Sequence, residues 1–311
     1  MDARILVIGS SNIDFVLKTS YVPVSDETLV TEGSYGFVPG GQGANAAITV
    51  ARLGGESVFC SRVGDDAYGD RLLQIFSENG IDRRFVRVDE TEQTGLAAVL
   101  VEKNGSNRII VYSGANRNIG ESDIENAMRC LPDIIVANLE ITATAAEFLS
   151  RLAQAKGHPV VLDCGGMSKN FDLRRIKKLE IISPNENETQ LLTGIHPESL
   201  DDCLRACMAI YSKTDVKYVV LKLGARGSYI YDGKYCDICG PYEVEAVDTT
   251  AAGDAFTAAL AFEYSRTGGD IYAACRYGNA AGALAVTKPG ALTSLPTKDE
   301  VELFMASHSQ T

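Results

Sequence analysis

The stretch of sequence that decides the fold is Val247-Asp248-Thr249-Thr250-Ala251-Ala252-Gly253-Asp254-Ala255-Phe256, which opens a long helix-forming run of small residues. A helix start leaves unpaired backbone N–H groups at the positive end of the helix dipole. We interpret Ala251, Ala252 and Gly253 as an anion hole in which phosphate charge develops. Asp254 follows in the first turn, where a carboxylate can accept the proton of an attacking hydroxyl. A simple helix-end charge is the structural alternative for Asp254.

A second glycine-rich stretch, Pro39-Gly40-Gly41-Gln42-Gly43-Ala44-Asn45-Ala46-Ala47, precedes an amphipathic segment. Glycines at a helix entrance let a ligand approach the backbone, and the free N–H groups there favour oxygen-rich ligands. Residues 41–46 also match the dinucleotide pattern G-x-G-x-x-A, so an NAD-dependent oxidoreductase is an alternative from another class. That pattern should directly follow the first strand, whereas here it lies about 30 residues beyond it. A glycine-rich turn without a ligand is the structural alternative.

Short β-rich runs alternate with longer segments of helical period along most of the chain, which is typical of parallel strands joined by crossover helices. The predicted strands are residues 5–8, 57–60, 134–137, 160–162, 181–182 and 218–221. The predicted helices are residues 42–53, 67–79, 121–129, 142–156, 199–213, 252–267, 270–287 and 297–306. This order predicts an α/β fold with a doubly wound, mostly parallel sheet flanked by helices.

Two stretches break this rhythm, at about 13–38 and 94–112, because strand-like runs follow one another there without a helix between them. Asn104-Gly105 separates two such runs and predicts a hairpin turn. We expect both stretches to pair into one small β-sheet that projects from the body as an active-site lid. Because no internal repeat or Pro/Ser-rich linker interrupts the chain, residues 1–311 are predicted to form one domain carrying this lid.

Composition limits the classes of function. The chain has 29 Lys and Arg against 41 Asp and Glu, and its net charge of −12 repels nucleic acid and anionic lipid. The densest basic cluster, residues 174–178, is interpreted as a solvated helix face. Neither a signal peptide nor a membrane span is predicted, so we expect a cytoplasmic protein. The eight cysteines are then expected to be reduced, and Cys236 and Cys239 to lie on opposite faces of a strand rather than in a zinc or redox site.

The two glycine-rich stretches together resemble the signature motifs of the ribokinase-like, or PfkB, carbohydrate kinases. The resemblance covers essentially the whole chain, because further segments match the family pattern: Gly9–Asp14, Arg62–Gly69, Asn138–Glu140, Ser183–Glu188, Leu223–Gly227 and Tyr277–Ala281. It implies the doubly wound fold with a β-sheet lid, and ATP-dependent transfer of phosphate to the terminal hydroxyl of a sugar. The chain has no Walker A pattern, as expected of a family that holds ATP without a P-loop.

The resemblance also implies roles for individual residues. Asp254 would be the general base, and Ala251, Ala252 and Gly253 the anion hole. The implied sugar-binding residues are Asn12, Asp14, Gly41, Gln42, Asn45, Glu140 and Asp254. Those implied for ATP are Asn185, Lys222, Gly224, Ala225, Gly227 and Asn279. Glu188 would hold Mg²⁺ through water, and an activating K⁺ would lie among Asp248, Thr250, Ala285, Lys288, Gly290 and Ser294, bound mainly by carbonyl oxygens.

Purely structural roles are the alternatives for several of these residues. Asn12, Asp14 and Asn45 could serve turns and caps, and Glu140 could be a strand-end charge. Asn185 and Glu188 also have the spacing of a helix capping box, which is compatible with a function in addition.

One residue departs from the family's ribokinase branch, because Gln42 stands where that branch usually has Lys. A neutral amide in place of a charged donor leaves the identity of the sugar open more than the reaction. D-ribose is the leading substrate, and fructose, ketodeoxygluconate, deoxyribose or a nucleoside are the alternatives within the family. A regulatory sugar-binding module of kinase descent is a further class. Pairing of lids across a homodimer is also compatible with the resemblance.

Overall fold

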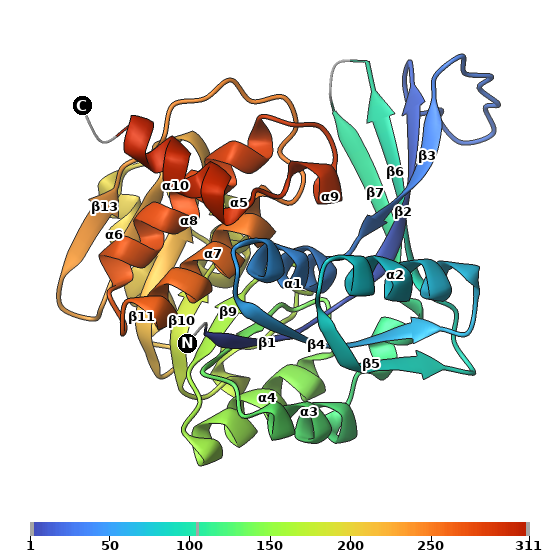
Figure 1. Ribbon diagram of the computed structural model, residues 1–311. Helices are drawn as coiled ribbons and strands as arrows, with labels where there is room; N and C mark the ends of the chain where they lie inside the picture. Colours follow the sequence, from blue (N-terminus) through green and yellow to red (C-terminus); the bar gives the residue numbers. More distant parts are fainter. Residues whose placement is uncertain (1–2, 104–105, 309–311) are drawn as a thin grey trace.

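The computed structural model describes residues 3–103 and 106–308, and in that part of the chain it contains two β-sheets (Figure 1). The larger sheet has nine strands, seven of them parallel, with two antiparallel strands at one edge. The predicted doubly wound, mostly parallel sheet is therefore confirmed. The strands lie in the order β13 (Cys236–Cys239), β12 (Ser228–Tyr231), β11 (Val216–Lys222), β10 (Leu179–Ser183), β9 (Val160–Asp163), β8 (Ile134–Ala137), β1 (Arg4–Ile8), β4 (Glu56–Gly64) and β5 (Asp82–Asp89).

Helices cover both faces of this sheet, and the alternating side chains of β1 show where the core lies. Ile5 and Val7 belong to one apolar layer, and Leu6 and Ile8 to the other. The first layer includes α1 (Gln42–Arg52), α2 (Ala67–Glu78), α7 (Ala252–Arg266), α8 (Ile271–Val286) and α10 (Lys298–Ser307). The second includes α3 (Glu121–Ala127), α4 (Ala143–Lys156), α5 (Glu186–Thr193) and α6 (Leu200–Tyr211).

The predicted helices match the structure to within about two residues at each end, the usual uncertainty of helix boundaries. The sequence-based prediction misses β5, β12 and α5. The basic cluster at residues 174–178 is not a helix face, which corrects the prediction. Asp172 caps a three-residue 3-10 helix, Leu173–Arg175, and a positive φ of 46° at Lys178 then turns the chain into β10.

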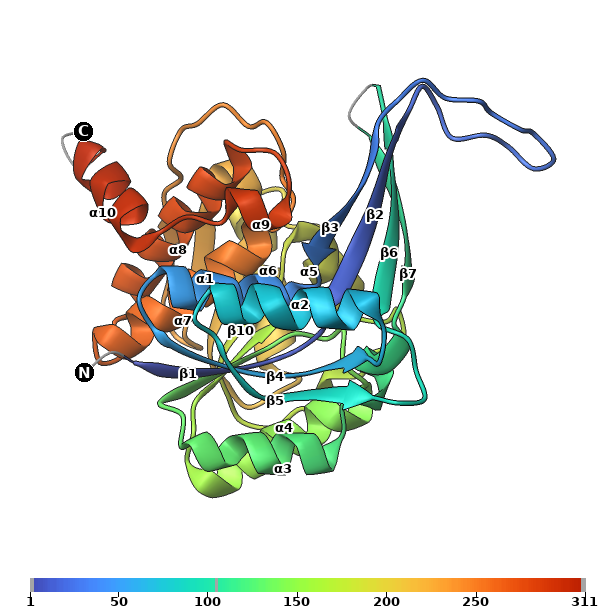
Figure 2. The same ribbon diagram turned by 45° about the vertical axis from the view of Figure 1, so that its right-hand side comes forward.

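A separate four-stranded sheet stands beside the body (Figure 2). Its strands lie in the order β3 (Tyr35–Gly40), β2 (Asn12–Thr19), β6 (Gly95–Glu102) and β7 (Asn107–Tyr112). β2 runs parallel to β6, and the other neighbours pair antiparallel. The predicted small sheet is confirmed, although residues 20–34 between β2 and β3 form no strand. The predicted turn at Asn104-Gly105 lies outside the described residues.

All eight cysteines are free thiols, as predicted. Cys236 is exposed and Cys239 is buried, so the two side chains lie on opposite faces of β13. Within residues 3–103 and 106–308, no helix combines the length and apolar character needed to cross a membrane.

Candidate active site

The candidate site lies at the carboxyl edge of the large sheet, where doubly wound folds bind their ligands. Asp163 is the last residue of β9, Lys222 is the last residue of β11, and Asn185 follows β10 as the N-cap of α5. Parallel strands end at the same edge, so residues distant in sequence meet there. The amino-terminal ends of α1 and α7 complete the site, through Asn45 and Asp254.

The start of α7 carries the predicted general base. Oδ2 of Asp254 accepts a 2.8 Å hydrogen bond from Nδ2 of Asn45, which is buried in α1. Ala251, the N-cap of α7, has a φ of 62°. This left-handed conformation costs an L-residue about 1–2 kcal/mol, and such strain is found where a corner serves a function. Ala252 and Gly253 follow directly and line the neighbouring cleft.

Carboxylates crowd this part of the molecule and change one another's acidity. Burial raises the pKa of Asp254 to about 8, and the charges of Asp163 and Glu140 add to that effect. The Asn45 hydrogen bond and the Lys222 charge oppose it. A carboxylate with a pKa near the working pH is well suited to accept a proton in a reaction. The geometry therefore allows Asp254 to act as a base.

Lys222 brings a cation into the same region. Its Nζ lies 2.6 Å from Oδ2 of Asp163, and both side chains are buried. The Thr257 hydroxyl in α7 donates to the same carboxylate oxygen. Sequence reasoning misses Asp163 and Thr257. A carboxylate directly after a buried strand and before Gly165 is the signal that could have revealed Asp163.

Asn12, Asp14 and Glu140 lie where the small sheet leaves the body. Oδ1 of Asn12 accepts a 2.8 Å hydrogen bond from Asn116, a residue that sequence reasoning also misses. Asn116 holds the backbone of Ser11 as well, through its N–H and its carbonyl. The site-facing loop after β1 is thus fixed by one buried amide.

Asp14 and Glu140 form the acidic part of this region. Burial and the charge of Glu140 raise the pKa of Asp14 to about 7. Burial also raises the pKa of Glu140, against hydrogen bonds from the Ser10 hydroxyl and the Gln42 backbone N–H. A side chain at Gly40, the last residue of β3, would collide with the Asp14 carboxylate and force it to move.

Gln42 packs its side-chain amide against Gly165, where any Cβ would collide with it. Its Oε1 is buried without a hydrogen-bond partner among the described residues. Gln42 lines the same small interior cavity as Asp163, Asp254 and Thr257. The neighbouring Gly41, with a φ of 91°, is the N-cap of α1. The Gly41–Ala46 pattern therefore follows β3 of the small sheet and does not follow the first strand of a dinucleotide-binding unit.

A larger cleft of about 560 Å³ adjoins the start of α7. It is lined by five of the residues predicted for ATP together with two of the anion hole: Lys222, Gly224, Ala225, Gly227, Asn279, Ala252 and Gly253. Nδ2 of Asn279 donates to the carbonyls of Cys239 and Gly240, so this side chain also fixes the cleft wall. Asn185 and Ala251 are not among the lining residues.

Asn185 and Glu188 form a reciprocal capping box at α5. Oδ1 of Asn185 accepts from the Glu188 N–H at 2.9 Å, while the Glu188 carboxylate accepts from the Asn185 N–H and Nδ2, each at 2.8 Å. The structural alternative of the sequence analysis is thus present. Burial raises the pKa of Glu188, against the charge of Lys222, which places this carboxylate close to the Lys222–Asp163 pair.

The residues predicted for a monovalent cation gather around the loop before α7. Asp248 accepts from the N–H and the hydroxyl of Thr250, and from the N–H of Gly290 at 2.8 Å. The Ser294 hydroxyl donates to the carbonyl of Ala291, and Lys288 pairs with Glu300 at 2.7 Å. These polar side chains already have partners and Ala285 lies buried in α8, which agrees with a cation bound mainly by the backbone carbonyls of this loop.

The structure contains a second hollow, of about 720 Å³, at the opposite edge of the sheet. It is lined by Glu180, Lys217 and Tyr264, whose polar atoms bind one another. Because Asp254 and the glycine-rich turns are absent from its lining, the smaller cleft at the carboxyl edge is the candidate site.

Comparison with known proteins identifies the family. The pattern described as "pfkB family carbohydrate kinase" matches residues 2–298. This chain belongs to that family. The ribokinase of Haemophilus influenzae is 33% identical, over 98% of this chain and 99% of its own length. The Salmonella typhi deoxyribokinase is 28% identical, over 97% of this chain and 98% of its own length.

The solved structures agree with this assignment. The Arabidopsis thaliana ribokinase complexed with ribose and ATP has a TM-score of 0.87 and 30% identity to this PfkB-family chain, and covers 98% of it and 99% of its own chain. The resemblance inferred from the sequence is confirmed. The protein is therefore a carbohydrate kinase, and the interpretations as an NAD-dependent oxidoreductase or as a binding module without enzymatic activity are set aside.

Proposed function

We propose that the protein transfers phosphate from ATP to the terminal hydroxyl of D-ribose, giving ribose 5-phosphate. The observation that carries the proposal is the Asn45–Asp254 hydrogen bond at the start of α7. It places a carboxylate with a pKa of about 8 between the acidic Asp14–Glu140 region and the cleft lined by Gly253. The ribokinase relatives and their complex with ribose and ATP support these two substrates.

In this mechanism the sugar occupies the region of Asn12, Asp14 and Gln42, and its hydroxyls bind their carboxylate and amide groups. Asp254, held by Asn45, accepts the proton of the terminal hydroxyl as its oxygen attacks the γ-phosphate, the bond from the γ-phosphorus to the β–γ bridging oxygen breaks, and ADP leaves. The N–H groups at the start of α7, by Ala252 and Gly253, stabilise the charge on the transferred phosphate. ATP extends into the cleft along Gly224, Ala225, Gly227 and Asn279, beside Asn185 and Lys222.

Mg²⁺ fits the excess of carboxylates around Lys222, and when bound it neutralises charge on the nucleotide phosphates. Glu188 would hold it through water, because both of its oxygens are engaged by Asn185. Among the described residues, no group of three or more acidic, His or Cys side chains is suited to bind a metal directly.

A K⁺ ion fits the loop of Asp248 and Thr250, next to residues 285–294. The Asp248 carboxylate supplies charge there, and the carbonyls of the loop would supply ligands. Such an ion would fix the loop that leads into the strained Ala251 and hence the start of α7.

The test is a measurement of ADP release with Mg-ATP over a panel of D-ribose, 2-deoxy-D-ribose, D-fructose, ketodeoxygluconate and adenosine. Each substrate is assayed with K⁺ and in a buffer free of Na⁺ and K⁺ at equal ionic strength. We expect the highest kcat/KM for D-ribose, and a higher rate with K⁺. A preference for another compound overturns the proposed substrate, and equal rates in both buffers overturn the cation site.

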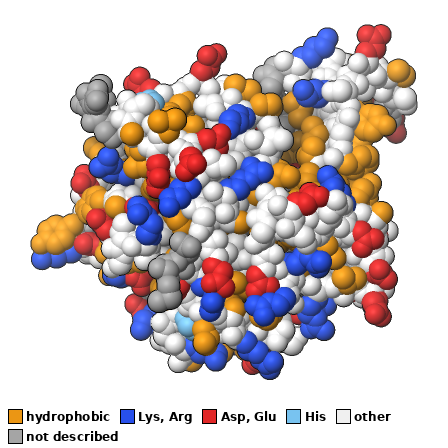
Figure 3. All heavy atoms as spheres, in the orientation of Figure 1, with side chains coloured by type: hydrophobic (Ala, Val, Ile, Leu, Met, Phe, Trp, Pro, Cys, Tyr) orange, Lys and Arg blue, Asp and Glu red, His pale blue; other side chains and the backbone are white. Residues whose placement is uncertain are grey.

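The small sheet would act as the lid of this site and as a contact between two copies of the chain. Its edge strand β7 is exposed along its whole length, with Ile110 72% exposed, and Tyr35 and Phe37 of β3 are also exposed. Figure 3 shows hydrophobic side chains gathered over this sheet. Exposed apolar edge strands pair readily with a second strand. Light scattering should give the mass of a dimer, and Ile110→Lys the mass of a monomer.

A further inference from the structure

The Lys222–Asp163 pair lies between the two parts of the site and has a geometry that the general mechanism does not explain. Asp163 lines the interior cavity that also contains Asp254 and Gln42. Lys222 lines the cleft on the other side, together with Gly253. The ammonium and its carboxylate partner therefore connect the sugar side to the nucleotide side.

The ammonium lies directly beside the start of α7. A Cβ built on Gly253 would be 3.5 Å from Nζ of Lys222, an ordinary van der Waals distance. Of the three N–H donors of this ammonium, one faces Asp163 at 2.6 Å and another faces the Thr257 hydroxyl at 3.5 Å. Among the described residues the third donor has no hydrogen-bond partner, so it is available to an anion that reaches Gly253.

The negative charge of Asp163 is what keeps a cation at this buried position. Burial alone would lower the pKa of Lys222, but the charges of Asp163 and Glu188 outweigh it and raise that pKa. Both oxygens of Asp163 are held in turn, since its Oδ1 accepts from the Gly165 N–H at 2.9 Å and its Oδ2, which faces Lys222, also accepts from the Thr257 hydroxyl. A lysine side chain is flexible, so a fixed carboxylate is needed to define where its ammonium lies.

We propose that Asp163 is a positioning residue for phosphoryl transfer, which holds the Lys222 ammonium beside Gly253 so that it binds the γ-phosphate as that group enters the anion hole. The inference rests on the proposed function and adds a residue to it. Thr257 assists by holding the Asp163 carboxylate from α7, the same helix that carries Asp254. Asp163, at the end of β9, thereby fixes the ammonium of Lys222 at the end of β11.

A binding measurement tests this placement without any sugar. Calorimetry compares ADP with a non-hydrolysable ATP analogue, each with Mg²⁺, for the parent, Asp163→Asn and Lys222→Met. We expect both variants to lose affinity for the analogue by about 10- to 100-fold, the usual effect of losing a charge-assisted hydrogen bond, with ADP affinity nearly unchanged. Equal losses for ADP and for the analogue, or no loss, would overturn the inference.

Kinetics of the double variant then test whether Asp163 acts through Lys222. Asp163→Asn should lower kcat by about 10- to 100-fold with little change in KM for the sugar. In the Lys222→Met background the same substitution should have little further effect, because the group that it positions is gone. Multiplied losses in the double variant would mean that Asp163 acts independently and would contradict the proposal.

Matched variants separate positioning from folding. Thr257→Val removes one hydrogen bond from Asp163 without changing any charge, and should give a smaller loss of kcat that again vanishes with Lys222→Met. Asp123→Asn removes a buried paired carboxylate far from the cleft and should leave affinity for the analogue unchanged. A parent protein that binds no ATP analogue would refute the proposed function, whereas a parent that binds it with Asp163→Asn unaltered refutes only this inference.

Discussion

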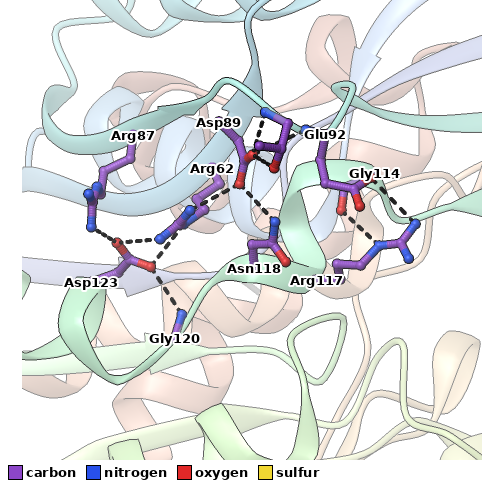
Figure 4. A network of polar contacts seen from close by, with 10 residues as sticks. Arg62, Arg87, Asp89, Glu92, Gly114, Arg117, Asn118, Gly120 and Asp123 are labelled. Atoms are coloured by element: carbon purple, nitrogen blue, oxygen red, sulfur yellow. Dashed lines mark hydrogen bonds and ion pairs between the residues drawn. The ribbon is translucent and has the colours of Figure 1, made fainter.

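Two clusters of charge, each built around a buried carboxylate, differ in how completely their groups are paired. In the first, Arg62 bridges Asp89 at 3.0 Å and Asp123 at 2.9 Å, and Arg87 also binds Asp123 at 2.9 Å (Figure 4). Asp123 receives a further hydrogen bond from the Gly120 N–H. Two guanidinium groups thus face two carboxylates, and hydrogen bonds from Asn118 and Thr91 hold the pKa of Asp89 well below its usual range.

The second cluster is the one around Lys222, and its charges do not balance. One ammonium lies among Asp163, Glu188 and Asp254, and burial raises the pKa values of Glu188 and Asp254. In the first cluster, balanced charges hold β4, β5 and α3 together. In the cluster around Lys222, the excess of carboxylates leaves groups that can exchange protons and cations. Carboxylates paired with cationic side chains thus stabilise the fold in the first cluster and are available for chemistry in the second.

The largest expected effect comes from removing the base itself. Asp254→Asn keeps the shape and the Asn45 contact but cannot accept a proton, so kcat should fall by about 10²–10⁴-fold while ATP binding persists. Initial rates with saturating sugar and Mg-ATP check this. Turnover within tenfold of the parent would show that Asp254 is not the general base, and the two clusters would then not differ in function as described.

In the balanced cluster of Arg62, Arg87, Asp89 and Asp123, we expect a substitution to lower the stability of the fold and to leave the activity unchanged. Asp123→Asn removes a fully buried carboxylate that pairs with the largely buried Arg62 and with the exposed Arg87, and breaking such a buried pair typically costs about 3–5 kcal/mol of the free energy of unfolding. Urea unfolding followed by circular dichroism measures it. The kcat per folded molecule should stay within about twofold of the parent, since no reacting group is touched; a large loss of kcat would place this network in the active site.

Gln42 tests the sugar side of the site, because its buried Oε1 has no hydrogen-bond partner in the described part of the chain. An amide donates and accepts, whereas an ammonium only donates and is costly to bury. Gln42→Lys should therefore change the ratio of kcat/KM for ribose to that for other sugars by about tenfold or more, with the KM for ATP nearly unchanged. A flat preference across the panel would place Gln42 outside the sugar site.

The smallest expected effect is that of Asp254→Asn on the stability of the fold. Unlike Asp123→Asn, this substitution should raise the stability. Because the folded-state pKa of Asp254 is raised to about 8, the unfolded chain binds fewer protons between its ordinary carboxyl pKa and that value. This group therefore lowers stability as the pH rises through that window. At pH 8 Asp254→Asn should raise Tm by several degrees, and at pH 4 by little. Thermal scans at both pH values check the sign, and a lower Tm at pH 8 would contradict it.

Much of this fold could be predicted from the sequence, because buried parallel strands such as Ile134–Ala137 are apolar throughout and crossover helices have clear caps. The prediction misses α5 because its capping box is followed by only eight residues, too few for a helical period to be evident. It misses β5 because this edge strand begins with three consecutive charged residues, Asp82 to Arg84, and has no continuous apolar run.

The site was predictable where residues lie in compact motifs, as in Gly40–Asn45 and Asp248–Asp254. Asp163, Thr257 and Asn116 were not, because each acts through a partner that is distant in the chain. Asp163 meets Lys222 across 59 positions, and Asn116 meets Ser11 across 105. A single sequence contains no record of such pairings.

The way β2 begins has a mechanical consequence. Asn12, its first residue, pairs with Gly40 of β3 on one side and with Gly95 of β6 on the other. A side chain at Gly95 would collide with the Asn12 amide, just as one at Gly40 would collide with Asp14. If the four-stranded sheet is the lid of this site, as we propose, its attachment to the body lies where these close contacts are. A movement that carries the far end of the sheet over a wide arc would then shift Asn12 and Asp14 only slightly, so the site could open while the residues proposed to bind the sugar keep their places.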